Sequence, residues 1–199
     1  MFSKFLRNAA VVSLATAALS ATTFGTSASA APAVEAPTSP KASQQAPALS
    51  YQARAFLNNR RSQGLCVNAH IQDIGWQGWE CGRNVEVGTT GQGKRIEALA
   101  FESTRLGGVY AQAHVQDKGW MRVQGGQDRE RFWVGTTGEA KRLEAVRIGS
   151  RRTQIWAQAH VQDKGWMRAD RSDRRGPAEV GTVGEGKRLE ALRIGVVGR

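Results

Sequence analysis

Apolar and polar residues alternate along three segments of this chain, and each segment leads into the same turn sequence. From Val109 to Gln116, small apolar residues occupy the odd positions, and polar or aromatic residues occupy the even ones. The segments that begin near Leu65 and at Ile155 show the same alternation. A period of two residues is typical of a half-buried β-strand. Each run continues into Gln-Asp-x-Gly-Trp, in which Asp and Gly favour a turn, so a second strand is predicted to begin at the tryptophan.

A second shared motif follows each predicted hairpin. It reads Gly-Thr-Thr/Val-Gly and then Lys-Arg-Ile/Leu-Glu-Ala, as in residues 135–145. The segment Lys141–Ile148 contains good helix formers, but a short helix bounded by glycines would be marginal in isolation. We therefore predict a strand. It would place Leu143 and Ala145 on one face and Glu144, Val146 and Ile148 on the other.

The two motifs recur with a nearly fixed period. The steps between His70, His114 and His160 are 44 and 46 residues, and a period of this size is typical of like structural units. The units span about residues 61–103, 104–150 and 151–199. Three units of short strands predict an all-β domain with pseudo-threefold symmetry, either a β-prism, which we favour, or a β-trefoil. Tyr51–Phe56 is interpreted as an extra strand that closes the ring by pairing with Leu189–Ile194.

The repeated pattern resembles a known family. The sequence His-x-Gln-Asp-x-Gly-Trp, followed by Gly-Thr-Thr-Gly-x-x-Lys-Arg-Ile/Leu-Glu-Ala, is similar to the clostridial hydrophobic repeat with a Gly-Trp motif (hydrophobic W repeat). The resemblance covers about residues 61–199. It implies a secreted protein of a Gram-positive bacterium that binds extracellular surfaces or polymers.

The start of the chain has the features of an export signal. Lys4 and Arg7 precede an uncharged run rich in Ala, Val and Leu, and Ala28-Ser29-Ala30 is a small-x-small cleavage pattern. We predict a signal peptide at residues 1–30, a flexible Ala/Pro/Ser linker at 31–48 and the repeat domain at 49–199. The protein is expected to be secreted, not to span a membrane after cleavage, and to associate with the cell wall non-covalently if at all.

The only two cysteines, Cys66 and Cys81, lie in the first repeat. In an exported chain such a pair indicates a disulfide, and the alternative is two buried thiols. Each repeat supplies one histidine, so we expect no metal site and no cofactor.

The polar positions of each first strand form the candidate ligand-binding face. An aromatic ring beside amide and imidazole groups suits a sugar, which offers C–H faces for stacking and hydroxyls for hydrogen bonds. The alternative is that this face packs against a neighbouring sheet. The residues of the candidate face are Tyr110, Gln112, His114, Gln116, Trp156, Gln158, His160, Gln162, His70 and Gln72.

Residues 111–122 and 157–168 are identical, which predicts equivalent sites in repeats two and three and an altered one in repeat one, where Cys66 replaces the aromatic residue. The Gly-Trp tryptophans Trp76, Trp120 and Trp166 are interpreted as core, with exposed stacking platforms as the alternative. Trp79 and Trp133 have no counterparts; the residues that match Trp133 are Glu86 and Glu179.

Charge and motif content narrow the function. The formal net charge of +11 favours anionic partners such as wall polymers or acidic polysaccharides. No recognition helix or aromatic RNA motif indicates specific nucleic-acid binding. Candidate catalytic groups occur in triplicate, whereas an active site needs one constellation. The sequence therefore favours a monomeric, non-catalytic module that binds glycans at several sites. The alternatives are a protein-binding scaffold or inhibitor and, less favoured, a polysaccharide hydrolase.

Overall fold

A computed structural model describes residues 47–197 of the chain. The predicted signal peptide, and the predicted linker up to residue 46, lie outside the described residues. The described part contains the helix α1 (Tyr51–Asn58) and fifteen strands. The strands are β1 (Gly64–Ile71), β2 (Gly75–Trp76), β3 (Glu80–Gly82), β4 (Asn84–Gly88) and β5 (Ile96–Thr104) in repeat one, β6 (Val109–Val115), β7 (Gly119–Trp120), β8 (Gln124–Gly126), β9 (Phe132–Gly135) and β10 (Leu143–Ser150) in repeat two, and β11 (Ile155–Val161), β12 (Gly165–Trp166), β13 (Asp170–Arg171), β14 (Ala178–Gly181) and β15 (Leu189–Val196) in repeat three.

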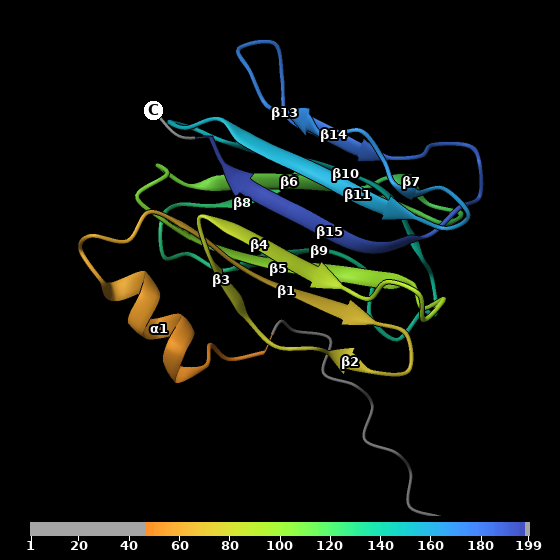
Figure 1. Cartoon of the computed structure of the whole chain (residues 1–199), viewed down its shortest axis with the longest axis horizontal. Helices are drawn as coiled ribbons and strands as arrows, with labels where there is room; N and C mark the ends of the chain where they lie inside the picture. The colour runs from red at the N-terminus through yellow and green to blue at the C-terminus, as the bar shows by residue number, and fades with distance from the viewer. Residues whose placement is uncertain (1–46, 198–199) are drawn as a thin grey trace, which may run out of the picture. The chain divides into compact units, whose positions relative to one another are not determined.

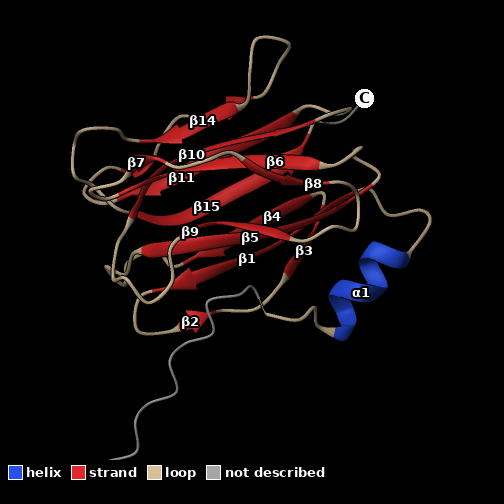
Figure 2. Cartoon of the chain, turned by 180° about the vertical axis from the view of Figure 1, so that it is seen from behind, coloured by secondary structure: helices blue, strands red, loops and turns tan. Residues whose placement is uncertain are grey.

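The strands form three five-stranded antiparallel sheets, one for each repeat (Figures 1 and 2). The first sheet has the order β2-β1-β5-β9 with β3 also on β1, the second β14-β10-β6-β7 with β8 on β6, and the third β12-β11-β15-β4 with β13 on β11. This confirms an all-β, prism-like domain of three repeats. Residues 47–197 form no closed barrel, the element on which the alternative trefoil is built.

Each sheet is completed by a strand from another repeat. Strand β9 of repeat two pairs with β5 of repeat one, and β14 of repeat three pairs with β10 of repeat two. Strand β4 of repeat one then pairs with β15 of repeat three. Every repeat thus donates one strand to the sheet of another, and the exchange closes into a ring that leaves no repeat complete without the others.

The inward faces of the sheets share one apolar core. The alternating residues of β1, β6 and β11 that were expected to be buried are buried there, together with the leucine, isoleucine, valine and phenylalanine residues of the three Leu/Ile-Glu-Ala strands. The donated strands add Val85, Val87, Val134 and Val180 to this core. Burial of each such valine contributes roughly 1.5–3 kcal/mol. Core packing therefore holds the exchanged strands in place together with their backbone hydrogen bonds.

A β-bulge interrupts each Leu/Ile-Glu-Ala strand and reverses part of the expected pattern. Leu143 pairs with Val115 and Ala145 with His114, so Glu144 is the extra residue. The same shift occurs at Glu97 and Glu190. The strand itself is confirmed, but the predicted faces are wrong: because the bulge adds one residue, Leu143, Val146 and Ile148 share the inward face.

The Gly-Thr motif fastens each donated strand to this bulge. Gly181 has φ +106°, and a Cβ at this position would lie 2.4 Å from the carbonyl oxygen of Glu144. The next residue, Thr182, donates its backbone N–H to that same oxygen at 2.8 Å. The equivalent pairs are Gly88-Thr89 on Glu190 and Gly135-Thr136 on Glu97. Only glycine permits both the positive φ and the close approach. The Gly-Thr-Thr/Val-Gly motif is therefore a turn between strands.

Residues 51–58 form a helix, so the predicted extra strand is wrong. The Ser50 side chain caps the helix by accepting from the Ala53 N–H, and Ala53 and Leu57, four residues apart, are buried. The helix covers the outer face of the first sheet, beside β3 (Figure 1). The strand that pairs with Leu189–Val196 is instead β4.

The predicted disulfide between Cys66 and Cys81 is present and joins β1 to β3. It lies under α1, in a small apolar cluster with Ala53 and Leu57.

No helix in residues 47–197 has the length and apolar character that crossing a bilayer requires.

The contact between the Gly181-Thr182 turn and the Glu144 carbonyl, which we call the Gly-Thr lock, predicts a large loss of stability for Gly181→Ala. The substitution combines a disfavoured φ with a backbone clash, and we expect the free energy of unfolding in urea to fall by roughly 3 kcal/mol or more. Gly184→Ala is the matched control, because Gly184 has φ +80° but nothing within 4 Å of the added Cβ. It should cost about 1 kcal/mol. Equal losses for the two variants would contradict the lock.

Candidate functional site

The bulge directs Glu144 toward the histidine of strand β6. Its Oε2 lies 3.0 Å from Nδ1 of His114, at ion-pair distance. Its Oε1 accepts a hydrogen bond from Nε of Arg142 at 3.0 Å and lies 2.7 Å from Nη2. Because Glu144 is buried, the guanidinium of Arg142 offsets part of the cost of removing its charge from water. The same trio recurs as Arg95, Glu97 and His70 and as Arg188, Glu190 and His160.

The Gly-Trp tryptophan lies against this histidine, on the outward face. Trp120 is directly opposite His114 in the hairpin, and their rings meet edge to face with centroids 5.3 Å apart. The guanidinium carbon of Arg147 lies 4.0 Å from the Trp120 ring centroid, which is a cation–π contact. In repeat three, Trp166 has the same contacts with His160 and Arg193.

The arginine over the tryptophan is held by the donated strand. Nε of Arg147 donates to Oε2 of Glu179 at 2.7 Å, and Glu179 belongs to β14 of repeat three. In the third sheet, Arg193 donates to Glu86 of β4 at 2.8 Å. Each of these two outer faces is therefore built from residues of two repeats.

An aromatic platform lies farther along the same strand. The Tyr110 ring covers Gly149, where an added Cβ would lie 2.5 Å from the phenol carbon Cζ. In the third sheet, Trp156 covers Gly195 in the same way. Both aromatic rings are half-buried. Glycine opposite the ring lets it lie flat on the sheet, so the ring can offer its other face to a ligand.

The amides next to these rings have structural partners. Nε2 of Gln112 donates to the Met121 carbonyl at 2.7 Å, and Nε2 of Gln158 donates to the Met167 carbonyl at 2.8 Å.

Beside Tyr110 is a pocket of about 280 Å³, lined by Tyr110, Gln112, Val123, Arg147 and Pro177. It joins an aromatic face, two apolar side chains, an amide and a guanidinium, a combination that suits one sugar ring.

The first sheet lacks an equivalent site. Cys66 and Asn68 replace the aromatic residue and the glutamine, and both are fully buried. Cys66 packs against α1, and Asn68 accepts a hydrogen bond from the Gly78 N–H. His70 is also buried. The position of Arg147 is taken by Ala100, and within residues 47–197 no arginine stacks on Trp76. The predicted His70 site is therefore closed, whereas the faces of repeats two and three are half-exposed.

Two groups of predicted residues lie elsewhere than expected. Trp76, Trp120 and Trp166 are not part of the core but are half-buried on the outer faces, because the hairpin places each opposite an outward histidine. Gln72, Gln116 and Gln162 follow the last residue of their strands. Six residues of strand span about 20 Å, so these glutamines are not brought to the aromatic platforms.

The Asp-x-Gly turns carry an ion pair each. Asp117 has φ +60°, and its carboxylate accepts a hydrogen bond from Lys141 at 2.9 Å, which lowers the pKa of this exposed group. Asp163 has the same partner in Lys187, and its pKa is lowered for the same reason. Exposed pairs of this kind contribute little to stability, so they define turn geometry more than they hold the fold.

The comparison with protein families agrees with the repeats seen in the structure. The family model described as clostridial hydrophobic W matches residues 70–102, 114–149 and 160–198, together more than half of the chain. The protein is therefore a member of the clostridial hydrophobic W family and carries three of its repeats. No curated protein and no solved structure matches the chain.

The buried carboxylate of Glu97 predicts a specific loss of stability in acid. Burial raises the pKa of Glu97, but His70 and Arg95 outweigh burial, and the net pKa lies below its ordinary value of 4.5. A carboxyl group with a lowered pKa stabilises the fold above its unfolded value, and the contribution is lost as the pH falls through its folded value. We expect urea-unfolding free energy to fall below about pH 4.5 in the wild type and to fall less steeply in Glu97→Gln. If the unfolding free energies of the wild type and Glu97→Gln fell in parallel with pH, the result would contradict a stabilising role for the Glu97 carboxylate.

Proposed function

We propose that the protein is an exported, non-catalytic module that binds glycans or cell-wall polymers through the outer faces of its second and third sheets. The observation that carries the proposal is the pair of equivalent platforms at Tyr110 and Trp156. Each ring lies over a glycine, and two residues before that glycine is an arginine that stacks on the Gly-Trp tryptophan. Flat aromatic rings beside fixed polar groups suit sugars, which combine apolar C–H faces with hydroxyls.

The repeated His–Glu pairs support a non-catalytic role. Each histidine faces a buried glutamate whose other oxygen is held by arginine, and the arrangement recurs in all three repeats. Such a network orients the tryptophan and fills the bonding capacity of the glutamate. In this proposal the trio supports the platform and transfers no proton to a substrate.

Multivalency would compensate for the small size of each site. Two platforms on one rigid body increase the apparent affinity for a polymer without a strong individual contact. The net charge of +11 favours acidic wall polymers, by an attraction that salt weakens. Membership of a hydrophobic W family and the signal-like N-terminus agree with a function outside the cell.

The proposal predicts that Tyr110→Ala combined with Trp156→Ala weakens binding to isolated Gram-positive cell walls by about tenfold or more, as each lost stacking contact is worth about 1 kcal/mol and avidity is lost as well. A pull-down with quantified bound fraction measures this, and each single variant should have an intermediate effect. Tyr51→Ala is the control, because Tyr51 is 87% exposed on α1, away from both platforms.

Unchanged binding by the double variant, with wild-type unfolding curves, would reject these faces. A protein without saccharide affinity that cross-links to one discrete protein would instead be a protein-binding scaffold. Turnover of a polymer that a single carboxylate substitution abolishes would favour a hydrolase.

A further inference from the structure

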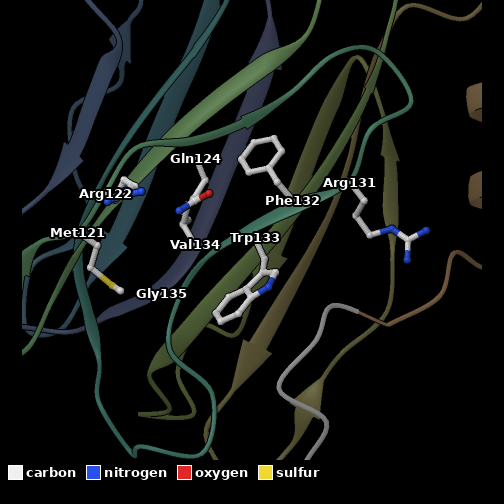
Figure 3. Close-up of a pocket in the computed structure, with 8 residues that line it drawn as sticks. All are labelled: Met121, Arg122, Gln124, Arg131, Phe132, Trp133, Val134 and Gly135. Carbon is white, nitrogen blue, oxygen red and sulfur yellow. The ribbon is translucent and has the colours of Figure 1, made fainter.

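Each place where a donated strand joins the sheet of another repeat forms a corner of the prism. The corner at β9 differs chemically from the corners at β14 and β4. A groove of about 400 Å³ follows the open edge of β9, between this strand and the segment that leads into β8. Figure 3 shows the Trp133 indole on one side and Met121 with Arg122 on the other, while Arg131 points away. Arg131 contacts the carboxylate of Glu102 and donates to the Pro47 carbonyl, so it is already engaged.

The register identifies the counterparts of the groove residues in the other repeats. Trp133 is opposite Ala100, whereas Glu179 is opposite Arg147 and Glu86 is opposite Arg193. On the other wall, Gln124 pairs with Ala111, and the matching residues of repeats three and one are Asp170 and Glu80. Two positions that are acidic at both other corners are thus neutral here.

The change also removes a hydrogen bond at the edge of the sheet. At the third corner, Asp170 accepts a hydrogen bond from the backbone N–H of Glu179 at 2.8 Å. The equivalent amide belongs to Trp133, and within residues 47–197 no hydrogen bond joins it to Gln124. Arg122 is exposed and has no carboxylate within ion-pair distance in the same described part of the chain. The groove therefore offers an indole face, a guanidinium and an amide side chain, without a carboxylate in its lining.

We propose that this groove is a third binding site, distinct from the outer-face platforms, and that it takes an acidic saccharide unit. The sugar ring stacks on Trp133, and its carboxylate binds Arg122 and the donors beside it. Loss of two carboxylates is what an anionic ligand requires, because like charge would repel it and a desolvated acidic wall would be costly. The site does not depend on Tyr110 or Trp156.

The test restores the residues of repeat three in the groove. Tetragalacturonate is titrated into the protein by calorimetry, and the wild type is compared with Gln124→Asp/Trp133→Glu. The double variant should bind at least about tenfold more weakly, because charge-assisted hydrogen bonds are worth roughly 1.5–3 kcal/mol. Arg122→Ala should cause a similar loss, and Trp133→Phe should retain most of the binding.

Arg168→Ala is the matched control, because Arg168 ends the identical twelve-residue segment of repeat three as Arg122 ends that of repeat two. It should leave tetragalacturonate binding within about twofold of wild type. Equal losses for Arg122→Ala and Arg168→Ala would overturn the proposal and indicate general attraction to a basic surface. So would an absence of tetragalacturonate binding by a folded wild-type protein.

Neutral chitotetraose distinguishes this site from the proposed function. If the groove selects acidic over neutral saccharides, the Gln124→Asp/Trp133→Glu variant should bind chitotetraose as tightly as the wild type does. Loss of tetragalacturonate binding in Tyr110→Ala/Trp156→Ala, with no loss in the groove variant, would assign the acidic ligand to the outer faces and reject the groove. If only the outer-face platforms prove not to bind glycans, the wild type should still bind tetragalacturonate and the groove variant should still lose that binding.

Discussion

The cyclic exchange of strands is the constraint on which the structure depends. Each sheet needs a strand from another repeat, and the Gly-Thr turn of that strand binds the Glu bulge of its host. A hairpin with one hydrophobic face is marginal alone, and here three of them bury that face against one another. The repeated glycine, threonine and glutamate thus have one structural explanation, since the turn and the bulge must match at every corner.

The same exchange builds the outer faces. The bulge places glutamate against histidine, the hairpin places tryptophan against the same histidine, and the donated glutamate positions the arginine over that tryptophan. Divergence at a few positions then changes one corner without changing the fold. In repeat one, the disulfide and α1 cover the face, whereas in repeat two, Trp133 and Gln124 open a groove of different charge. We propose that symmetric scaffolding and asymmetric surfaces together allow one small domain to bind more than one kind of group.

Local patterns in the sequence predicted most of the strands, the presence of three repeats and the disulfide, because alternation, turn residues and paired cysteines act over short distances. The errors have physical causes. An uninterrupted alternation assigned Val146 to the wrong face, since the bulge at Glu144 arises in the pairing with β6 and binds the donated Gly181-Thr182 turn, neither of which the segment's own alternation reveals. The Ser50 cap was the overlooked signal for α1. The register of the Gln-Asp-x-Gly turn, which sets His114 opposite Trp120, could have placed the tryptophan outside the core. The pairing of β4 with β15 is long-range and had no local signal.

The most direct test of the ring is a cross-link across its closing corner. Glu86 and Arg193 lie directly opposite each other on β4 and β15, 107 residues apart in the chain. In a Glu86→Cys/Arg193→Cys variant, mild oxidation should form a disulfide within the monomer, detected as a faster-migrating band on non-reducing electrophoresis and as the linked peptides by mass spectrometry. If the introduced cysteines form disulfides exclusively between molecules, or form none in the folded protein, the result would contradict a ring that one chain closes on itself.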